Sequence, residues 1–190
     1  MRGNTYLKIE SIYKKYRGYV GTKELIEEGF SNRQIAALTE EGYLEKICHG
    51  HYWLAGGQCR KPGDFKCIEV CLSNPRAVIC MESAVYYQGG IAEEPQYLSV
   101  ATERTDRSLL KMNFPIKRHY FSGNNFRHGI RKKDTEFGCY NIYDMERSIC
   151  DMLRLEQEIG IEIIDSVKNN RQQYERIMKY AELFGLKPQF

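Results

Sequence analysis

The spacing of apolar residues at the start of the chain predicts a helix followed by a short extended segment. Apolar side chains recur there at intervals of three and four residues, which places them along one face of a helix. Asn4 or Thr5 would cap this helix, and the segment 18–21 interrupts it with an extended piece. The residues predicted to form its buried stripe are Ile9, Ile12, Tyr13 and Tyr16.

Two more helices are predicted on either side of a glycine-containing turn. Thr22 would cap a two-turn helix that ends at Gly29, because glycine readily adopts the left-handed backbone at a helix C-terminus. The run Ser-Asn-Arg-Gln at 31–34 has the pattern of a capping box, in which the serine and glutamine side chains bond to free backbone amides. The helix that it opens ends at Gly42. Two short helices joined by such a turn are typical of a helix-turn-helix.

Two β-rich runs follow these helices. They cover 43–48 and 51–54, and the two residues between them include Gly50, which predicts a tight hairpin. The order helix, short strand, helix, turn, helix and hairpin is that of a winged helix-turn-helix. In this architecture the third helix enters the major groove of DNA, and the residues near its N-terminus reach the edges of the bases.

Candidate DNA contacts follow from this predicted geometry. Arg33 can offer a bidentate fork to guanine, and Asn32 or Gln34 can read adenine. Helix N-termini bind phosphate through free amides, and Lys23 would hold the DNA backbone. In the alternative interpretation the winged helix only binds protein, and Gln34 only closes the capping box. The predicted DNA-binding residues are Thr22, Lys23, Ser31, Asn32, Arg33, Gln34, Lys46, His49 and His51.

Beyond residue 61, predicted helices and strands mix without a regular βαβ period. This pattern favours an α+β fold over a doubly wound sheet. We therefore expect a winged helix-turn-helix DNA-binding domain over 1–61 and a mixed α+β domain over 62–190. In the second domain, helices are expected over 64–73, 145–154, 158–170 and 172–184, strands over 97–102 and 116–121, and a strand pair over 131–133 and 137–143.

Composition and cysteine content narrow the class of protein. The chain is 42% hydrophobic and 12% aromatic, as expected for a globular fold. No run approaches the roughly 18 consecutive apolar residues of a membrane span, and the N-terminal segment lacks the apolar core of a secretory signal. Seven cysteines at irregular spacing favour reduced thiols over a disulfide framework. We expect a cytoplasmic protein that does not contact a membrane.

The distribution of charge is more informative than the net charge of +3. Residues 1–61 carry 10 Lys and Arg against 7 Asp and Glu, whereas residues 62–190 carry 18 of each. Within the neutral part, the segment 117–133 holds six basic residues and no acid, which predicts a second basic patch. The alternative is that these charges are solvated faces of unrelated elements. The six residues are Lys117, Arg118, Arg127, Arg131, Lys132 and Lys133.

Nothing in the sequence favours an enzyme. Cys67 and Cys71 share one helix face, but a structural zinc site usually has close cysteine pairs in both halves of the motif. Asp144 is better interpreted as a helix cap, and Asp151 as the partner of Arg147 one turn earlier. Phosphate-binding and dinucleotide-binding glycine motifs are absent from the sequence. We expect no catalytic residue, metal or cofactor, and a metal-dependent nuclease is the least favoured alternative.

Several segments carry a resemblance to a known family. The runs 21–25, 29–31, 38–46 and 50–54 resemble the N-terminal winged helix of AbiEi-type antitoxins. The runs 78–84, 146–154 and 180–185 resemble blocks of the C-terminal domain of that family, in the same order. The basic run 131–133 matches no block of the family, so its role rests on charge alone.

The resemblance implies a function in viral defence by abortive infection. AbiEi-type proteins are the antitoxins of type IV toxin–antitoxin systems, which repress their own operon at inverted repeats and counter a nucleotidyltransferase-like toxin. The expected partners are therefore double-stranded DNA with an inverted repeat in the chain's own promoter, and a cognate toxin of that class. An inverted repeat needs two winged helices, so the chain would bind DNA as two cooperating monomers or as a homodimer.

Overall fold

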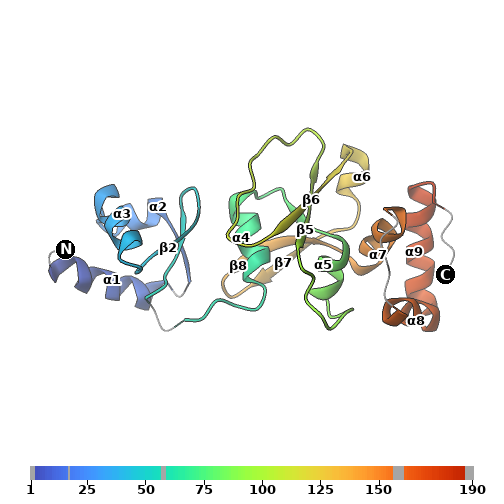
Figure 1. Cartoon of the computed structure of the whole chain (residues 1–190), viewed down its shortest axis with the longest axis horizontal. Helices are drawn as coiled ribbons and strands as arrows, with labels where there is room; N and C mark the ends of the chain where they lie inside the picture. Colours follow the sequence, from blue (N-terminus) through green and yellow to red (C-terminus); the bar gives the residue numbers. More distant parts are fainter. Residues whose placement is uncertain (1–2, 17, 57–58, 156–160, 187–190) are drawn as a thin grey trace. The chain divides into compact units, whose positions relative to one another are not determined.

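The structure is a computed structural model that describes residues 3–16, 18–56, 59–155 and 161–186. Helices and sheets are mixed along the chain, which confirms the predicted α+β class (Figure 1). None of the described helices has both the length and the apolar character needed to cross a membrane.

The chain divides into two compact units. The first unit comprises residues 1–75, 110–113 and 134–139, and the second comprises 76–109, 114–133 and 140–190.

The first unit contains three helices, a small sheet and a fourth helix. The sheet is antiparallel and three-stranded, with β3 in the centre, and a bulge interrupts the pairing of β2 with β3. The elements are α1 (Gly3–Lys15), β1 (Tyr19–Gly21), α2 (Thr22–Glu27), α3 (Asn32–Glu40), β2 (Glu45–Cys48), β3 (His51–Trp53) and α4 (Phe65–Ser73).

The apolar stripe predicted for the first helix is confirmed. Ile9 and Ile12 are each 1% exposed, and Tyr13 and Tyr16 pack against the same core. The predicted cap is wrong, because α1 already begins at Gly3, before both of the proposed capping residues. The other buried members of this core are Val20, Leu25, Phe30, Ile35, Leu38, Leu44 and Leu54.

The start of α2 also differs from the prediction. Thr22 is the first helical residue, and Gly21 occupies the capping position in an extended conformation. The Glu24 side chain reaches back and accepts a hydrogen bond from the Gly21 amide at 2.5 Å. The amide of Thr22 donates to the carbonyl of Gly50 at 2.8 Å instead. Thr22 therefore connects the helix to the hairpin turn and does not cap the helix.

Helix α4 is joined to the small sheet by an ionic network around the buried Glu69. Glu69 on α4 is 2% exposed and accepts a hydrogen bond from the Tyr19 hydroxyl at 3.0 Å. Lys61 forms ion pairs with Glu69 at 2.7 Å and with Glu45 at 2.8 Å. Burial raises the pKa of Glu69, and the Lys61 ammonium opposes that shift. These bonds connect the segment after the hairpin to the sheet.

An aromatic contact also brings residues distant in sequence into the first unit. The Phe137 ring lies 6.0 Å from the ring of Trp53, which in turn contacts the ring of Tyr19 at 5.0 Å. At Gly18, a Cβ atom would lie 2.8 Å from the Phe137 ring, so a side chain there would displace it. The tip of a distant hairpin thus packs on the β1–β3 pair of the small sheet.

The second unit contains the remaining described helices and most of a mixed sheet, whose β7–β8 tip belongs to the first unit. The sheet has five strands in the order β6-β5-β4-β8-β7, in which β5 pairs parallel with β6 and antiparallel with β4. Helix α5 packs against α7, and α7 against α9 (Figure 1). The elements are β4 (Val78–Ile79), α5 (Met81–Tyr86), β5 (Leu98–Glu103), β6 (Ile116–Phe121), α6 (Gly123–Arg127), β7 (Ile130–Thr135), β8 (Gly138–Tyr143), α7 (Met145–Arg154), α8 (Ile161–Asn169) and α9 (Arg171–Leu183).

Helix α7 carries a fully buried ion pair. Asp144 caps the helix as predicted, since its carboxylate accepts a hydrogen bond from the Arg147 amide at 2.9 Å. The Arg147 Nε atom donates to Asp151 Oδ2 at 2.8 Å, and both side chains are 0% exposed. The guanidinium group lies 4.5 Å from the ring centre of Tyr143 and 4.3 Å from that of Phe184. The predicted pair is therefore confirmed, and it belongs to the core.

Candidate nucleic-acid interface

The turn between α2 and α3 is held by buried apolar side chains. Leu25 and Phe30 are 0% and 2% exposed, and Ile35 and Leu38 on α3 face the same core. Gly29 has a φ of +84°, which a residue with a side chain adopts only under strain. Because this packing fixes the rotation of α3, the opposite face of the helix points outward.

The N-terminus of α3 presents two polar side chains to solvent. Asn32 and Arg33 are both exposed. The predicted capping box is confirmed: Ser31 Oγ accepts a hydrogen bond from the Gln34 amide at 3.3 Å, and Gln34 Oε1 accepts one from the Ser31 amide at 2.8 Å. Of the three residues predicted to read bases, Asn32 and Arg33 are therefore the two whose side chains lie outside the capping box.

The hairpin turn lies against the N-terminus of α2. The hydrogen bond from Thr22 to Gly50 brings Lys23 close to the turn that carries His49 and His51. Gly50 has a φ of +79°, as the tight turn requires. Lys23 and His49 are exposed, whereas Thr22 and His51 are half-buried. This arrangement unites four of the predicted contact residues in one place.

Three side chains of this region have further neighbours. Lys46 is exposed on β2, where it is paired with Tyr52. His51 Nδ1 lies 3.6 Å from Cys48 Sγ. Lys23 lies 3.9 Å from Glu27 one turn later, and its side chain is 90% exposed, so this pair holds it weakly. Lys23 and Lys46 are therefore accessible to an anion.

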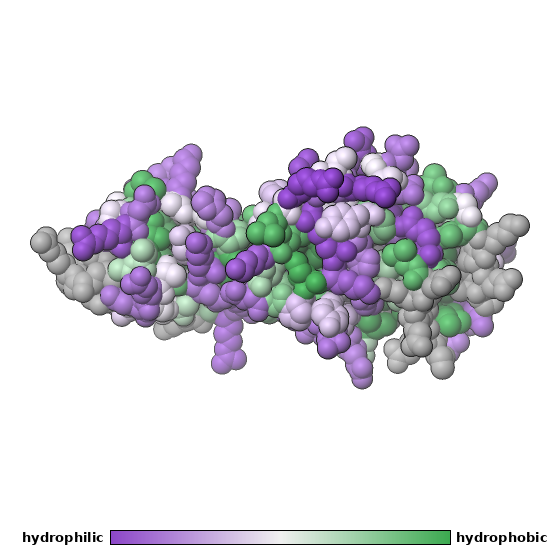
Figure 2. All heavy atoms as spheres, turned by 45° about the horizontal axis from the view of Figure 1, so that its top comes forward, coloured by the Kyte–Doolittle hydropathy of each residue, from purple (hydrophilic) through white to green (hydrophobic). Residues whose placement is uncertain are grey.

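The residues of the predicted second basic patch are distributed over both edges of the five-stranded sheet. Lys117 and Arg118 lie on β6 at one edge, and the run 131–133 lies on β7 at the other. Four steps of about 4.8 Å between strands separate these edges. Hydrophilic side chains gather over the part of the surface where β6 and α6 lie (Figure 2). The structure thus separates these residues into two groups.

The side chains of the two groups have different neighbours. Arg118 faces inward and donates to Thr102 Oγ1 at 2.8 Å. Lys133 lies 5.5 Å from the ring centre of Tyr140, and Arg131 lies 3.9 Å from Asp144. The exposed members are Lys117, Arg127, Arg131, Lys132 and Lys133.

Sequence reasoning did not identify a polar cluster on β5, β6 and α5. Ser99 Oγ donates to Glu82 Oε1 at 2.9 Å, and His119 Nε2 lies 3.4 Å from the same Oγ. The hydroxyl cannot act as a nucleophile on a substrate, because Ser99 is 0% exposed. The three residues lie on separate elements, so no local sequence pattern could have found them. The cluster links α5 to the β5–β6 pair.

Protonation of His119 is expected to destabilise the fold. Burial lowers the pKa of His119, Lys117 lowers it further and Glu82 opposes these shifts. Because the pKa is lower in the folded than in the unfolded chain, the stabilisation is complete above the unfolded value of 6.5 and is lost as the pH falls toward the folded value. Urea titrations of the wild type and of His119→Gln at about pH 7.5 and pH 5 measure this loss.

The wild type is expected to lose more free energy of unfolding than His119→Gln over this pH interval. Other titrating groups are common to both proteins, so their contributions cancel in the difference. Equal losses in the two proteins would show that His119 is not protected from protonation.

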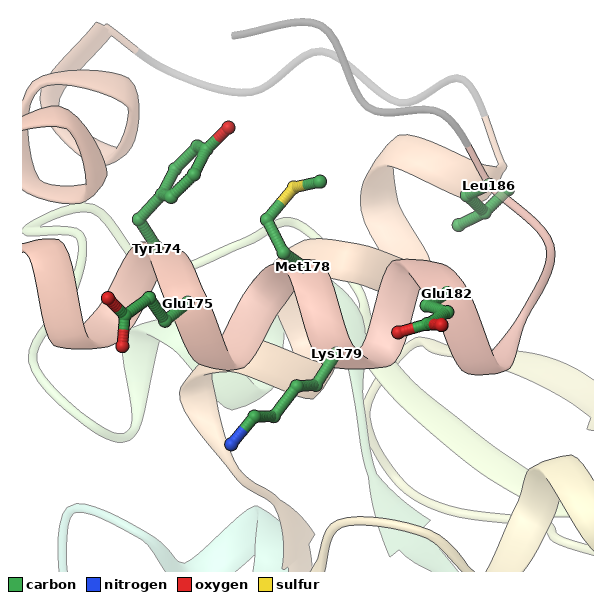
Figure 3. Close-up of a pocket in the computed structure, with 6 residues that line it drawn as sticks. All are labelled: Tyr174, Glu175, Met178, Lys179, Glu182 and Leu186. Atoms are coloured by element: carbon green, nitrogen blue, oxygen red, sulfur yellow. The ribbon is translucent and has the colours of Figure 1, made fainter.

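A shallow depression of about 620 Å³ lies along α9. Tyr174 and Met178 point to one side of the helix, whereas Glu175 and Lys179 point away from them (Figure 3). Leu186 lies beyond the end of the helix. Since the polar groups do not converge, the depression has no arrangement suited to catalysis.

The described residues contain no group of three or more His, Cys, Asp or Glu side chains that could hold a metal ion. Cys67 and Cys71, the residues considered for zinc, are buried in α4, where cysteine commonly acts as a small apolar side chain. Comparison of the chain with protein-family models and with curated proteins gave no match.

Proposed function

We propose that the chain is a DNA-binding transcriptional repressor of the AbiEi antitoxin type, with a winged helix-turn-helix at its N-terminus. In this proposal α3 reads bases in the major groove through Asn32 and Arg33, and the β2–β3 hairpin is the wing. The observation that carries the proposal is the pair of exposed polar residues at the capped N-terminus of a helix whose other face is buried. That geometry is the one in which a recognition helix reaches base edges.

The element order supports this interpretation. Helix, strand, two helices and a hairpin follow one another, and the hairpin strand β3 pairs with β1, which precedes α2. The bond between Thr22 and Gly50 holds the wing beside the start of α2. In the proposal, Lys23 on α2 and the wing residues Lys46 and His49 are phosphate contacts.

The antitoxin role rests on the resemblance carried by segments in both parts of the chain. It implies that the protein acts in the cytoplasm without catalysis of its own, represses its operon at an inverted repeat, and counters a nucleotidyltransferase-like toxin. Expression of a neighbouring gene of that class should arrest growth, and co-expression of this chain should restore it. Growth arrest that persists on co-expression would contradict the antitoxin role.

The DNA-binding role is tested by a gel shift with DNA from upstream of the chain's own gene. We expect binding at physiological salt at far lower protein concentration than to a scrambled duplex of equal length, with two bound species if two chains occupy an inverted repeat. Equal affinity for the two duplexes would contradict the repressor proposal.

A protein-interaction module is the alternative that exposed apolar residues favour. Ile26 on α2 is 50% exposed and Leu7 on α1 is 69% exposed. Single exposed apolar residues are common, so this observation is weaker than the geometry of α3. A module that binds only protein would be poorly retained on heparin at low salt, whereas a DNA-binding chain would be retained.

A further inference from the structure

The loop between β5 and β6 turns its acid inward and its arginines outward. Asp106 is the only acid between residues 104 and 115, and its side chain is 5% exposed. It forms an ion pair with Arg118 at 3.4 Å and accepts a hydrogen bond from the Ser108 amide at 2.8 Å. Arg104 and Arg107, in contrast, are exposed. The accessible charge of this part of the loop is therefore positive.

The same loop is held in place by hydrogen bonds. Arg118 donates to the carbonyl of Ser108 at 2.5 Å and to that of Asp106 at 3.2 Å. The amide of Arg104 donates to the carbonyl of Phe121 at the end of β6, at 2.8 Å. A loop fixed in this way loses little conformational entropy when it binds a partner.

A third arginine lies at the same end of the sheet. The Arg127 side chain, at the end of α6, is 78% exposed, and its Nη2 atom lies 3.9 Å from Glu103 Oε1. Glu103 is the last residue of β5, directly before Arg104, and only 26% of its side chain is exposed. We name this group of three residues, Arg104, Arg107 and Arg127, the arginine end.

Protection of a sheet edge does not explain these arginines. Charges that prevent edge-to-edge pairing stand on the edge strand itself, as Lys117 does on β6. All three members of the arginine end lie outside the strands. Residues 104–133 contain nine Lys and Arg and a single acid, Asp106, which is buried. Arginine forks match phosphate oxygens in geometry as well as in charge.

We propose that the arginine end binds the phosphate backbone of nucleic acid without reading its bases. This contact is separate from the proposed base reading by α3, because it lies in the second unit and needs no particular sequence. Each bound phosphate releases condensed counterions, so the contact appears as a dependence of affinity on salt.

The test is a fluorescence anisotropy titration of the full chain with a labelled DNA duplex of arbitrary sequence, at salt concentrations between about 50 and 200 mM. The variant Arg104→Ala/Arg107→Ala/Arg127→Ala should lower the slope of log affinity against log salt by about 2 to 3, since each phosphate contributes about 0.9. Replacement of the same three residues by lysine should retain most of the slope, because lysine keeps the charge.

A matched control removes the same charge from α8 and α9. The variant Lys168→Ala/Arg171→Ala/Lys179→Ala changes three exposed basic residues and should leave the slope unaltered. Circular dichroism establishes that the alanine variant, the lysine variant and the control variant are all folded. An unaltered slope in the alanine variant of the arginine end overturns the proposal and directs attention to an acidic protein partner. An equal loss in the control also overturns it, because net charge alone would then explain the effect.

These outcomes are independent of the proposed repressor role. The repressor role fails if DNA from upstream of the gene is bound no better than a scrambled duplex. The arginine end fails if its removal leaves binding to an arbitrary duplex unchanged.

Discussion

Replacement of Arg147 by alanine is expected to lower the free energy of unfolding by about 3–5 kcal/mol. Its guanidinium donates to Asp151 at 2.8 Å and to the carbonyl of His128 at 2.9 Å. Its removal breaks one of the two ion pairs of the buried Asp151. The other remains, with the Arg154 Nη2 atom 3.0 Å from the other carboxylate oxygen. Urea denaturation followed by circular dichroism measures the loss.

Two further variants separate the effect of the buried charge on stability from the effect of packing. The double variant Arg147→Met/Asp151→Leu removes both charges and keeps apolar volume, so it should retain more stability than Arg147→Ala. Arg176→Ala breaks an ion pair with Glu146 at 3.3 Å in which the arginine is 60% exposed, and should cost less than about 1 kcal/mol. If Arg147→Ala were as mild as Arg176→Ala, the buried pair would not support the fold.

The second large effect is expected at Arg33. Its replacement by alanine should weaken binding to DNA from upstream of the chain's own gene by about 1–3 kcal/mol, because a bidentate contact to guanine would be lost. Binding to a scrambled duplex should change much less, so the preference for the specific site decreases. Competition gel shifts with the two duplexes measure both effects.

The control for this experiment is Arg171→Ala, which removes another exposed arginine, from α9. It should leave the preference between the two duplexes unaltered. If Arg33→Ala weakened binding to both duplexes by the same factor, Arg33 would contact phosphate and would not read bases. Since Arg33 lies at the exposed N-terminus of α3, the experiment also tests the orientation proposed for that helix.

Features that depend on neighbouring residues were predictable from the sequence. The capping box at Ser31, the cap at Asp144 and the strand Ile116–Phe121 were all predicted correctly. Each is determined by bonds within one turn or by alternation within one strand. The cap of α2 was wrong for a tertiary reason, because the Thr22 amide bonds to the distant carbonyl of Gly50.

Arrangements that join distant segments required the tertiary structure. Helical spacing indicated that Arg147 and Asp151 face one another, but only the packing of Tyr143 and Phe184 around them shows that the pair is buried. The basic residues of 117–133 lie at two opposite edges of a sheet, because the strand order β6-β5-β4-β8-β7 differs from the order of the strands along the chain.

The accessible charge of the loop between β5 and β6 is a further property that depends on the tertiary structure. Composition shows that basic residues exceed acids there, and it cannot show which charges face solvent. Contacts with Arg118 turn Asp106 inward and leave Arg104 and Arg107 exposed. Local sequence was thus sufficient to predict most of the helices and the caps at Ser31 and Asp144, whereas the caps predicted for α1 and α2 were wrong. Burial and pairing between segments far apart in the chain determine which charges are accessible to a partner, because side-chain periodicity specifies a face but not what covers it.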